Sequence, residues 1–305
     1  MTDIQLEREH QTDATVTDIH DFWLLLKPRV MSLVIFTALV GLVRADGDIH
    51  IVLAFTTILC IAIGAGASGA LNMYYDVDID RLMSRTAQRP IASGRVRPGD
   101  ALSFGIALSV ASVLMLGLNV SWMGAGLLAF TIFFYAVVYT VWLKRATPQN
   151  IVIGGLAGAL PPLVSWVSVT QQFSWEPIVM VAIIFMWTPP HFWALSLFKE
   201  EDYRAAGVPM MPIVHGQQHT KLQILLYSLL LWPIGLLPWY FGWAGNMYGV
   251  IAAIVGLWFC WSCGRLYMSN TDLMIKRAKQ CFGVSIVHLF VLFAALLIDG
   301  VFDGF

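Results

Sequence analysis

The chain has 305 residues, of which 58% are hydrophobic and only 12% are charged, and its net charge is −1. Soluble proteins carry roughly twice that charged share, about 25%, and a soluble globule of this composition would expose large apolar patches to water. The composition therefore excludes a soluble protein and indicates a multi-spanning membrane protein. It also argues against nucleic-acid binding, because no excess of cationic side chains exists to pair with phosphate backbones.

Nine apolar runs are long enough to cross a bilayer, which takes about 20 residues of helix. The runs are continuous rather than alternating, which favours helices over a β-barrel because backbone groups in lipid must be paired within their own segment. We therefore predict an all-α membrane protein with nine transmembrane helices. The expected ranges are 22–45, 51–75, 100–119, 122–142, 151–170, 176–198, 222–242, 247–268 and 282–299.

The placement of the cationic side chains supports this count. With nine spans, seventeen of the eighteen Lys and Arg residues fall on one side of the membrane, and only Arg44 falls in a loop on the other side. The positive-inside rule makes the common side cytoplasmic, so we expect a cytoplasmic N-terminus and an outer C-terminus. Residues 1–21 hold six acids and one Arg, which fits neither a signal peptide nor a transit peptide. They are interpreted as a cytoplasmic tail, followed by a single membrane domain over residues 22–305.

An acidic motif ends the second predicted span. Asn72, Asp76 and Asp80 stand at intervals of four residues, so a continuous helix would stack them on one face, about 6 Å apart. Stacked carboxylates repel one another, and a divalent cation would remove the repulsion. Carboxylate and amide oxygens are ligands that Mg²⁺ prefers, so the spacing predicts a Mg²⁺ site, for which Asp78 is the weaker candidate because it points away. The alternative is an acidic helix end whose carboxylates lie in water.

Cationic side chains accompany the acidic motif. Arg81, Arg85 and Arg89 repeat at the same interval of four, and Lys144 and Arg145 end the fourth predicted span. Guanidinium groups bind phosphate oxygens through paired hydrogen bonds, so metal-binding acids beside arginines are the combination that a diphosphate requires. The alternative is that these cations bind no ligand and only mark the cytoplasmic side of the membrane.

The motif Asn72-x-x-x-Asp76-x-x-x-Asp80 resembles the first aspartate-rich motif of the UbiA superfamily of intramembrane prenyltransferases. Further blocks are similar to its protohaem IX farnesyltransferase branch, and they follow in order over residues 72–216. These blocks are Arg85-Thr-Ala-Gln-Arg89-Pro90 with Ser93-Gly94, Tyr139-Thr140 with Leu143-Lys144-Arg145-x-Thr147-Pro148-Gln149-Asn150, Gly154-Gly155 with Gly158-Ala-Leu-Pro161-Pro162, Trp187-Thr-Pro-Pro-His191-Phe192-Trp193, and Asp202-Tyr203-x-x-Ala206-Gly207-x-Pro209-Met210.

The resemblance implies a helical bundle around a central cavity that opens toward the cytoplasmic side of a bacterial inner membrane. It implies transfer of a farnesyl group from farnesyl diphosphate to a vinyl group of haem b, which gives haem O, with Mg²⁺ as cofactor. The protein partners that it implies are haem A synthase or the terminal-oxidase assembly machinery. The catalytic residues that it implies are Asn72, Asp76, Asp80 and Asp202, of which the first three hold the metal. The diphosphate-binding residues that it implies are Arg85, Arg89, Lys144, Arg145 and Lys199.

The chain departs from the wider superfamily after the sixth predicted span. Most members carry a second Asp-x-x-x-Asp motif there, whereas residues 199–204 of this chain contain acids without that spacing. Asp202 is the residue that we carry over, and the number of Mg²⁺ ions, one or two, stays open. A regular second motif would have favoured the alternative acceptor, a quinone precursor.

His191 follows Pro189 and Pro190 inside the sixth predicted span. Prolines at membrane depth interrupt the helical hydrogen bonds, which is tolerated mainly beside protein or a cavity, and an ionisable residue there is a functional candidate. We interpret His191 as haem-binding; the alternative is a hydrogen-bonded packing histidine.

Two other classes of protein are weaker hypotheses. A transporter would show inverted repeats and acids at mid-membrane, and the sequence shows neither clearly. A haem-binding module without catalysis would leave the acidic and arginine series without a role.

Overall fold

The computed structural model describes residues 18–302, and every regular element in that range is a helix. Eight of the helices described are long and apolar enough to cross a membrane, and a bent pair, α2 and α3, is a candidate for the ninth span. The predicted all-α membrane fold is confirmed, and the count of nine depends on that pair. The helices are α2 (Ile19–Leu25), α3 (Pro28–Val43), α4 (Ile51–Tyr75), α5 (Val77–Leu82), α6 (Pro98–Asn119), α7 (Trp122–Phe133), the π-helix η1 (Phe134–Leu143), α8 (Asn150–Ala159), α9 (Pro161–Thr170), α10 (Trp175–Phe198), α11 (Glu200–Ala205), α12 (Met211–His215), α13 (Gln217–Tyr240), α14 (Asn246–Tyr267) and α15 (Thr271–Phe302).

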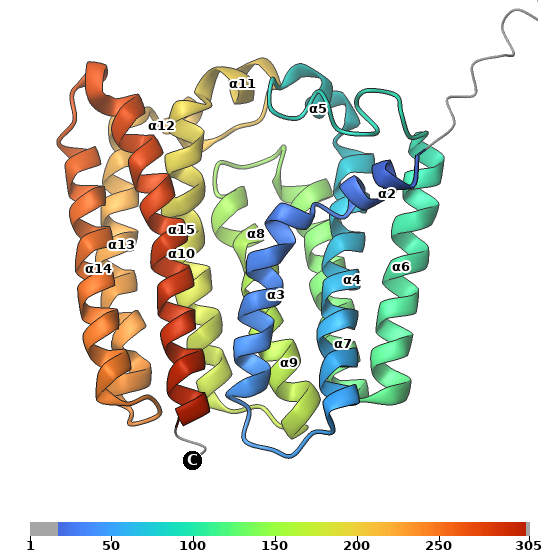
Figure 1. The fold of residues 1–305 in the computed structure, drawn as a ribbon. Helices are drawn as coiled ribbons and strands as arrows, with labels where there is room; N and C mark the ends of the chain where they lie inside the picture. Colours follow the sequence, from blue (N-terminus) through green and yellow to red (C-terminus); the bar gives the residue numbers. More distant parts are fainter. Residues whose placement is uncertain (1–17, 303–305) are drawn as a thin grey trace, which may run out of the picture.

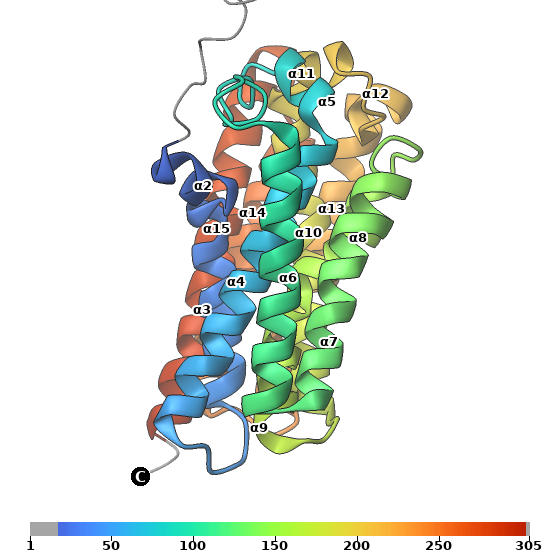
Figure 2. The same ribbon diagram turned by 90° about the vertical axis from the view of Figure 1, so that its right-hand side faces the viewer.

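The long helices stand side by side in one bundle (Figure 1). On one side, α10, α13, α14 and α15 pack together around the largest apolar core, and on the other side α4 packs against α3, α6 and α7. The helices α8 and α9 lie between these groups in Figure 1, and α8 packs on α10. The short helices α5, α11 and α12 gather at one end of the bundle, as both views show (Figures 1 and 2). That end carries most of the cationic loops.

The first predicted span, residues 22–45, is not one straight helix. The helices α2 and α3 meet at an angle of 53°, because Lys27 between them adopts a left-handed backbone with φ 53° and Pro28 starts the new helix. Proline suits a first helical position because it needs no hydrogen bond to its nitrogen. Part of the predicted tail also belongs to α2, since Asp18 caps it and Asp21 is buried against Arg95, 2.8 Å away. Residues 1–17, the rest of that tail, lie outside the described residues.

Two proline pairs have opposite effects on the helices that contain them. Pro161 and Pro162 begin α9 and so divide the predicted span 151–170 into two helices. In contrast, α10 continues through Pro189 and Pro190, so the two hydrogen bonds that these prolines cannot donate are missing without ending the helix. The Thr188 hydroxyl, just before the prolines, donates to the carbonyl oxygen of Ile184 at 2.8 Å.

Glycines let α8 pack closely against both of its neighbours. A Cβ atom at Gly154 would collide with the ring of Tyr139 in η1, and one at Gly155 would collide with Thr188 in α10. Small residues permit such close approach between membrane helices. These contacts place α8 between η1 and α10, and η1 carries one side of the polar site described next.

Candidate active site

The acidic motif lies where α4 gives way to α5. The helix breaks at Asp76, so the predicted continuous stripe is interrupted, but the Asp76 nitrogen still donates to the Asn72 carbonyl and the Asp80 nitrogen to the Asp76 carbonyl. These two bonds, of 3.0 and 2.8 Å, keep the three residues in register. All three are buried, with Asp76 at 0% exposure. Their burial excludes the alternative in which these carboxylates lie in water.

Each polar group of the motif has a cationic partner. Lys144 forms an ion pair with Asp76 through its Nζ atom, and Arg89 holds both oxygens of Asp80 at 2.9 and 2.7 Å. Lys27 donates to the Asn72 Oδ1 atom at 2.6 Å. Buried carboxylates are costly without such partners. The partners come from three separate parts of the chain, so the folded bundle brings them to one site.

The π-helix η1 supplies the opposite wall of the site. Asn72 Nδ2 donates to Asp76 Oδ2 at 2.6 Å and to Thr140 Oγ1 at 3.1 Å. Thr140 is fully buried, and its hydroxyl donates to the Tyr135 carbonyl, five residues earlier. Single π turns are frequent at functional sites. The sequence predicts an ordinary helix here, and the Tyr139-Thr140 block is its one indication that this helix contributes to the site.

Asp78 and Arg145 form a separate pair at the edge of the site. Arg145 holds both oxygens of Asp78 at 2.8 and 2.7 Å and lies 3.9 Å from Asp76 Oδ1. The hydrogen bonds from Arg145 lower the pKa of Asp78 below its usual value. Because the Asp78 side chain is 61% exposed, its orientation agrees with its ranking as the weaker metal ligand.

The acidic stretch after α10 meets α5 at the same end of the bundle. Asp202 accepts a hydrogen bond from Ser84 at 2.8 Å and lies 3.3 Å from Lys199. Burial alone would raise the pKa of Asp202, but these hydrogen bonds outweigh it and lower the pKa below its usual value. Arg85 interacts with the Tyr203 side chain. An apolar cluster of Ile79, Met83, Ile151, Tyr203, Val208 and Met210 joins the two regions.

The two acidic regions are therefore adjacent but not merged. Among residues 18–302, no hydrogen bond or ion pair joins Asp202 to Asp76 or Asp80. Lys199 likewise contacts Asp202 and Ser84 rather than the buried motif. The structure thus separates the predicted site residues into one buried group and one group closer to water.

His191 lies apart from both groups, in the packing between α10 and α15. Its Nδ1 atom is 2.7 Å from the Ser285 hydroxyl, and its ring stacks between Trp187 and Phe282, with centroid distances of 4.2 and 4.4 Å. The residue is 8% exposed. These contacts match a packing histidine held by a hydrogen bond, and haem binding by His191 stays a prediction.

The donor atoms present suit a hard cation. The described residues contain no cluster of three or more His, Cys, Asp or Glu side chains that could hold a metal ion, so any metal here would need the Asn72 amide beside the carboxylates. Asp76 Oδ1 is buried and accepts no hydrogen bond from the residues described, which is rare for a buried polar atom. The oxygens of Asn72 and Asp76 already attract the ammonium groups of Lys27 and Lys144. Such oxygens suit Mg²⁺, which usually takes a few protein oxygens.

Lys27 is a site residue that the sequence reasoning missed. It stands in the bend between α2 and α3, and its side chain reaches Asn72 on α4. Non-glycine residues with a left-handed backbone are uncommon and cluster at functional sites. The signal that the sequence offers is a lysine directly before a proline at the start of a span.

Comparison with known proteins places this fold and site in one family. The UbiA prenyltransferase family matches residues 33–296. Protoheme IX farnesyltransferase 2 of Mesorhizobium japonicum is 59% identical over 284 residues, which cover 93% of this chain and 90% of that protein. Protoheme IX farnesyltransferase of Azorhizobium caulinodans is 58% identical over 285 residues, 93% of each chain.

Solved structures agree on the fold. A structure of digeranylgeranylglyceryl phosphate synthase superposes with a TM-score of 0.76 at 15% identity, covering 93% of this chain and 98% of that one. A UbiA homologue from Archaeoglobus fulgidus bound to DMAPP and Mg²⁺ gives 0.69 at 15% identity, with 90% and 99% covered. At such low identity these two similarities show the fold alone. The family match over residues 33–296, with relatives 59% and 58% identical, establishes that the chain belongs to the UbiA prenyltransferase family.

Proposed function

We propose that this protein transfers a farnesyl group from farnesyl diphosphate to a vinyl group of haem b and so makes haem O. The observation that carries the proposal is the buried pair of carboxylates, Asp76 and Asp80, surrounded by cationic side chains at one end of a membrane bundle. The choice of donor and acceptor is supported by relatives up to 59% identical that are named protoheme IX farnesyltransferases.

An excess of positive charge supports diphosphate binding at this end of the bundle. Lys27, Lys144 and Arg89 contact the buried motif directly, and Arg145 lies beside it at 3.9 Å. Arg145 also pairs with Asp78, so these four cations face three carboxylates. A bound diphosphate would offset the positive charge that remains. Lysine and arginine side chains stabilise the charge that develops on a departing diphosphate.

Mg²⁺ is the cofactor that we assign, with Asn72, Asp76 and Asp80 as the residues that would hold it. The UbiA homologue from Archaeoglobus fulgidus, solved with DMAPP and Mg²⁺, supports this choice. When bound, the metal acts as a Lewis acid toward phosphate oxygens. Asp202 and Lys199 both contact Ser84, just after α5, so they could bind a second ion at the water-facing edge of the site. The variant Asp202→Asn tests this.

The proposed reaction breaks the bond between the farnesyl C1 carbon and its oxygen, and the diphosphate leaves with the electron pair. A vinyl carbon of haem b forms the new bond to farnesyl C1, water adds to the cation that results, and one proton is released, which leaves a hydroxyl group. Lys144, Arg89 and Lys27 hold the anionic end of the donor. An open apolar groove of about 320 Å³ between η1, α8 and α10, lined by Phe134, Ile153 and Phe185 among others, offers the hydrophobic surface that a prenyl chain requires.

The orientation in the membrane follows from the cationic loops at the end of the bundle that holds the acidic motif. Since the cationic loops gather at the end with α5 and α11, that end would face the cytoplasm under the positive-inside rule, and the N-terminus with it. We place the protein in the bacterial inner membrane. A haem A synthase or an oxidase-assembly factor is the class of partner that would receive the product.

Mass spectrometry of a reconstituted reaction tests the proposal. Purified protein is given haem b, farnesyl diphosphate and MgCl₂, with EDTA in a parallel sample. We expect farnesylated, hydroxylated haem only where Mg²⁺ is present. If folded protein makes no such product but prenylates a quinone precursor, the acceptor assignment is wrong, whereas product of equal yield in EDTA would contradict the metal.

A further inference from the structure

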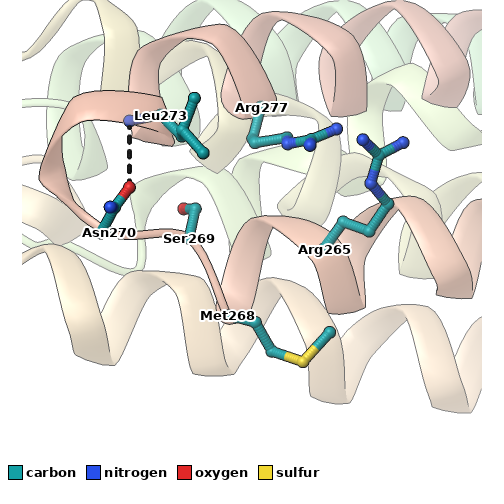
Figure 3. A pocket seen from close by; sticks show the side chains of 6 residues that line it. All are labelled: Arg265, Met268, Ser269, Asn270, Leu273 and Arg277. Carbon is teal, nitrogen blue, oxygen red and sulfur yellow. Dashed lines mark hydrogen bonds between the residues drawn. The ribbon is translucent and has the colours of Figure 1, made fainter.

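A second cationic site lies at the turn between α14 and α15, away from the acidic motif. A pocket of about 280 Å³ is lined there by Arg265, Met268, Ser269, Asn270, Leu273 and Arg277 (Figure 3). Arg265 is in the last turn of α14, whereas Arg277 is in the second turn of α15. Figure 3 shows both guanidinium groups extending to the same side of the pocket.

The two guanidinium groups have no carboxylate partner among the residues that the structure describes. Arg265 stacks on the Trp261 ring at 4.5 Å, and Arg277 donates to the Gln280 side chain at 3.1 Å. Asp272, in the first turn of α15, pairs with neither of them. This differs from the acidic motif, where Arg89 and Lys144 are held by carboxylates.

Two cations, Arg265 and Arg277, line the pocket itself. The buried Lys221 of α13 lies behind it and donates to the backbone carbonyl of Ser269 at 2.8 Å. Like charges gathered in one pocket repel, and the repulsion is stronger where water is partly excluded. The positive-inside rule explains why cations lie at this end, but it does not require them to share one pocket. An anion bound between Arg265 and Arg277 would remove the repulsion.

The surroundings of the pocket distinguish among anions. Along α14, the side chains Ile254, Leu257 and Trp261 stand three or four residues apart on the same face as Arg265, and they are 63%, 55% and 56% exposed. In a bilayer that face meets acyl chains. Met268 and Leu273, at the pocket itself, are also exposed. A ligand with an anionic head and apolar chains would satisfy both the arginines and this stripe, whereas free phosphate would contact the arginines alone.

From these contacts we infer that the α14–α15 pocket binds the phosphate of an anionic phospholipid, with the acyl chains along Ile254, Leu257 and Trp261. Basic pockets between membrane helices on the cytoplasmic side are known to bind such head groups. The site is separate from the acidic motif, so the proposal does not depend on the reaction that the protein catalyses.

Native mass spectrometry of the full-length protein in detergent tests this inference. The protein is titrated with dioleoyl phosphatidylglycerol, dioleoyl phosphatidylcholine or glycerol 3-phosphate. We expect phosphatidylglycerol to bind most tightly of the three. Either R265Q or R277Q should lower the affinity for phosphatidylglycerol about fivefold, and the double variant should lower it at least about twentyfold. The matched control is K276Q, which removes one cation from the same helix without lining the pocket; its affinity should stay within about twofold of the unmodified protein.

Three results would overturn the inference. The first is equal binding of phosphatidylglycerol to the double variant and the unmodified protein. The second is equal affinity for phosphatidylcholine, which would remove the role of head-group charge. The third is displacement of the lipid by equimolar glycerol 3-phosphate, which would indicate a site for free phosphate esters. Unfolding of the double variant is checked by its melting temperature, which should match that of the unmodified protein. R265K/R277K, which keeps both charges, should bind phosphatidylglycerol within about threefold of the unmodified protein.

Discussion

Buried ion pairs occur at both ends of the bundle, but they are built differently. At the end opposite α5, Arg44 pairs with Asp299, stacks on the Trp243 ring at 5.2 Å and donates to the Trp243 carbonyl. Both oxygens of Asp299 also accept hydrogen bonds from the Gly245 nitrogen, at 3.1 and 2.9 Å. One positive and one negative charge thus balance each other and join α3, the α13–α14 loop and α15.

The acidic motif, in contrast, is not balanced. Lys27, Lys144 and Arg89 surround the carboxylates of Asp76 and Asp80, and one oxygen of Asp76 accepts no hydrogen bond from any residue between 18 and 302. The difference teaches that burial alone does not identify a functional charge. A balanced pair holds helices together, whereas a surplus of charge beside an unsatisfied oxygen is suited to a ligand. The Arg44 pair should therefore affect stability, and the acidic motif should affect activity.

The largest effect is expected for Asp76. Asp76→Asn keeps the shape of the side chain but removes the charge that would hold Mg²⁺, so kcat should fall about a thousandfold. The rate is measured as haem O formed per minute on protein that is folded at the assay temperature, because the variant leaves Lys144 without its charged partner and should also lower the melting temperature. Asp78→Asn is the matched control, since this carboxylate is two residues away and 61% exposed; it should lose less than about threefold. Similar losses in the two variants would contradict a specific role for Asp76.

Arg44 should show the opposite behaviour. Arg44→Gln leaves Asp299 as a buried charge without its partner, which typically costs about 3 kcal/mol, and the melting temperature should fall by on the order of 5 °C. Below that transition the rate of prenyl transfer should be within about twofold of the unmodified protein. Arg29→Gln, an exposed position on the same helix, serves as the control for losing a cation. A large loss of activity in folded R44Q would show that the two ends are not separable.

Asp202 tests whether the second acidic region contributes to the chemistry. Its lowered pKa keeps it ionised through the neutral range, so Asp202→Asn removes a full negative charge. We expect a loss of 10- to 100-fold, about that seen for groups that orient metal ligands, and a weaker dependence of rate on Mg²⁺ concentration. Glu201→Gln, its exposed neighbour, is the control. An unchanged Mg²⁺ titration in D202N would mean that a single ion, held by the acidic motif, is sufficient.

Lys27 should have a smaller effect than either carboxylate. Lys27→Gln keeps a donor for Asn72 but removes one cation from the site, and a charged hydrogen bond of this kind corresponds to about tenfold in rate or affinity. The expected change is a higher KM for farnesyl diphosphate. Lys27→Arg keeps the charge and should recover part of the activity. If Lys27→Gln lowers the melting temperature by as much as Arg44→Gln and leaves KM unchanged, Lys27 serves the bend between α2 and α3 only.

Apolar length and charge placement predicted most of the fold, because both are local properties of the chain. The range 51–75 agrees with α4 at both ends, and the other membrane helices differ from their predicted ranges mainly at their ends. The last helix begins eleven residues before its apolar run, at Thr271 rather than 282, because its first turns extend beyond the membrane. Local composition does not indicate where a helix will bend.

The parts that the sequence did not predict depend on contacts between distant segments. The break at Asp76, the π-helix around Thr140 and the left-handed backbone at Lys27 meet at one site formed by three segments. Intervals of four residues predicted that Asn72, Asp76 and Asp80 share a face. They did not predict that Lys27, far away in the sequence, donates to Asn72, because that contact depends on how α2 and α3 meet.

His191 lies in neither ion-pair cluster and offers the smallest but most specific prediction. Its Nδ1 atom contacts the Ser285 hydroxyl, and Trp187 Nε1 donates to the Ser285 carbonyl, so Ser285 fixes the histidine between α10 and α15. Ser285→Ala removes one hydrogen bond, and a net contribution of about 1 kcal/mol corresponds to a three- to fivefold change. If His191 faces haem, the change should appear in the KM for haem b and in the haem absorption spectrum, with the KM for farnesyl diphosphate unchanged.

A control on the same helix separates this role from packing. Ser196 is fully buried in α10 and donates only to the Trp193 carbonyl at 2.9 Å, so Ser196→Ala deletes a comparable hydroxyl that does not contact His191. Its kinetics should match the unmodified protein. Equal effects of Ser285→Ala and Ser196→Ala on stability, with no change in either KM or the haem spectrum, would identify His191 as a packing residue. In that case the haem contacts must lie elsewhere, and the Trp187–His191 block would owe its presence to the close packing of α10 against α15.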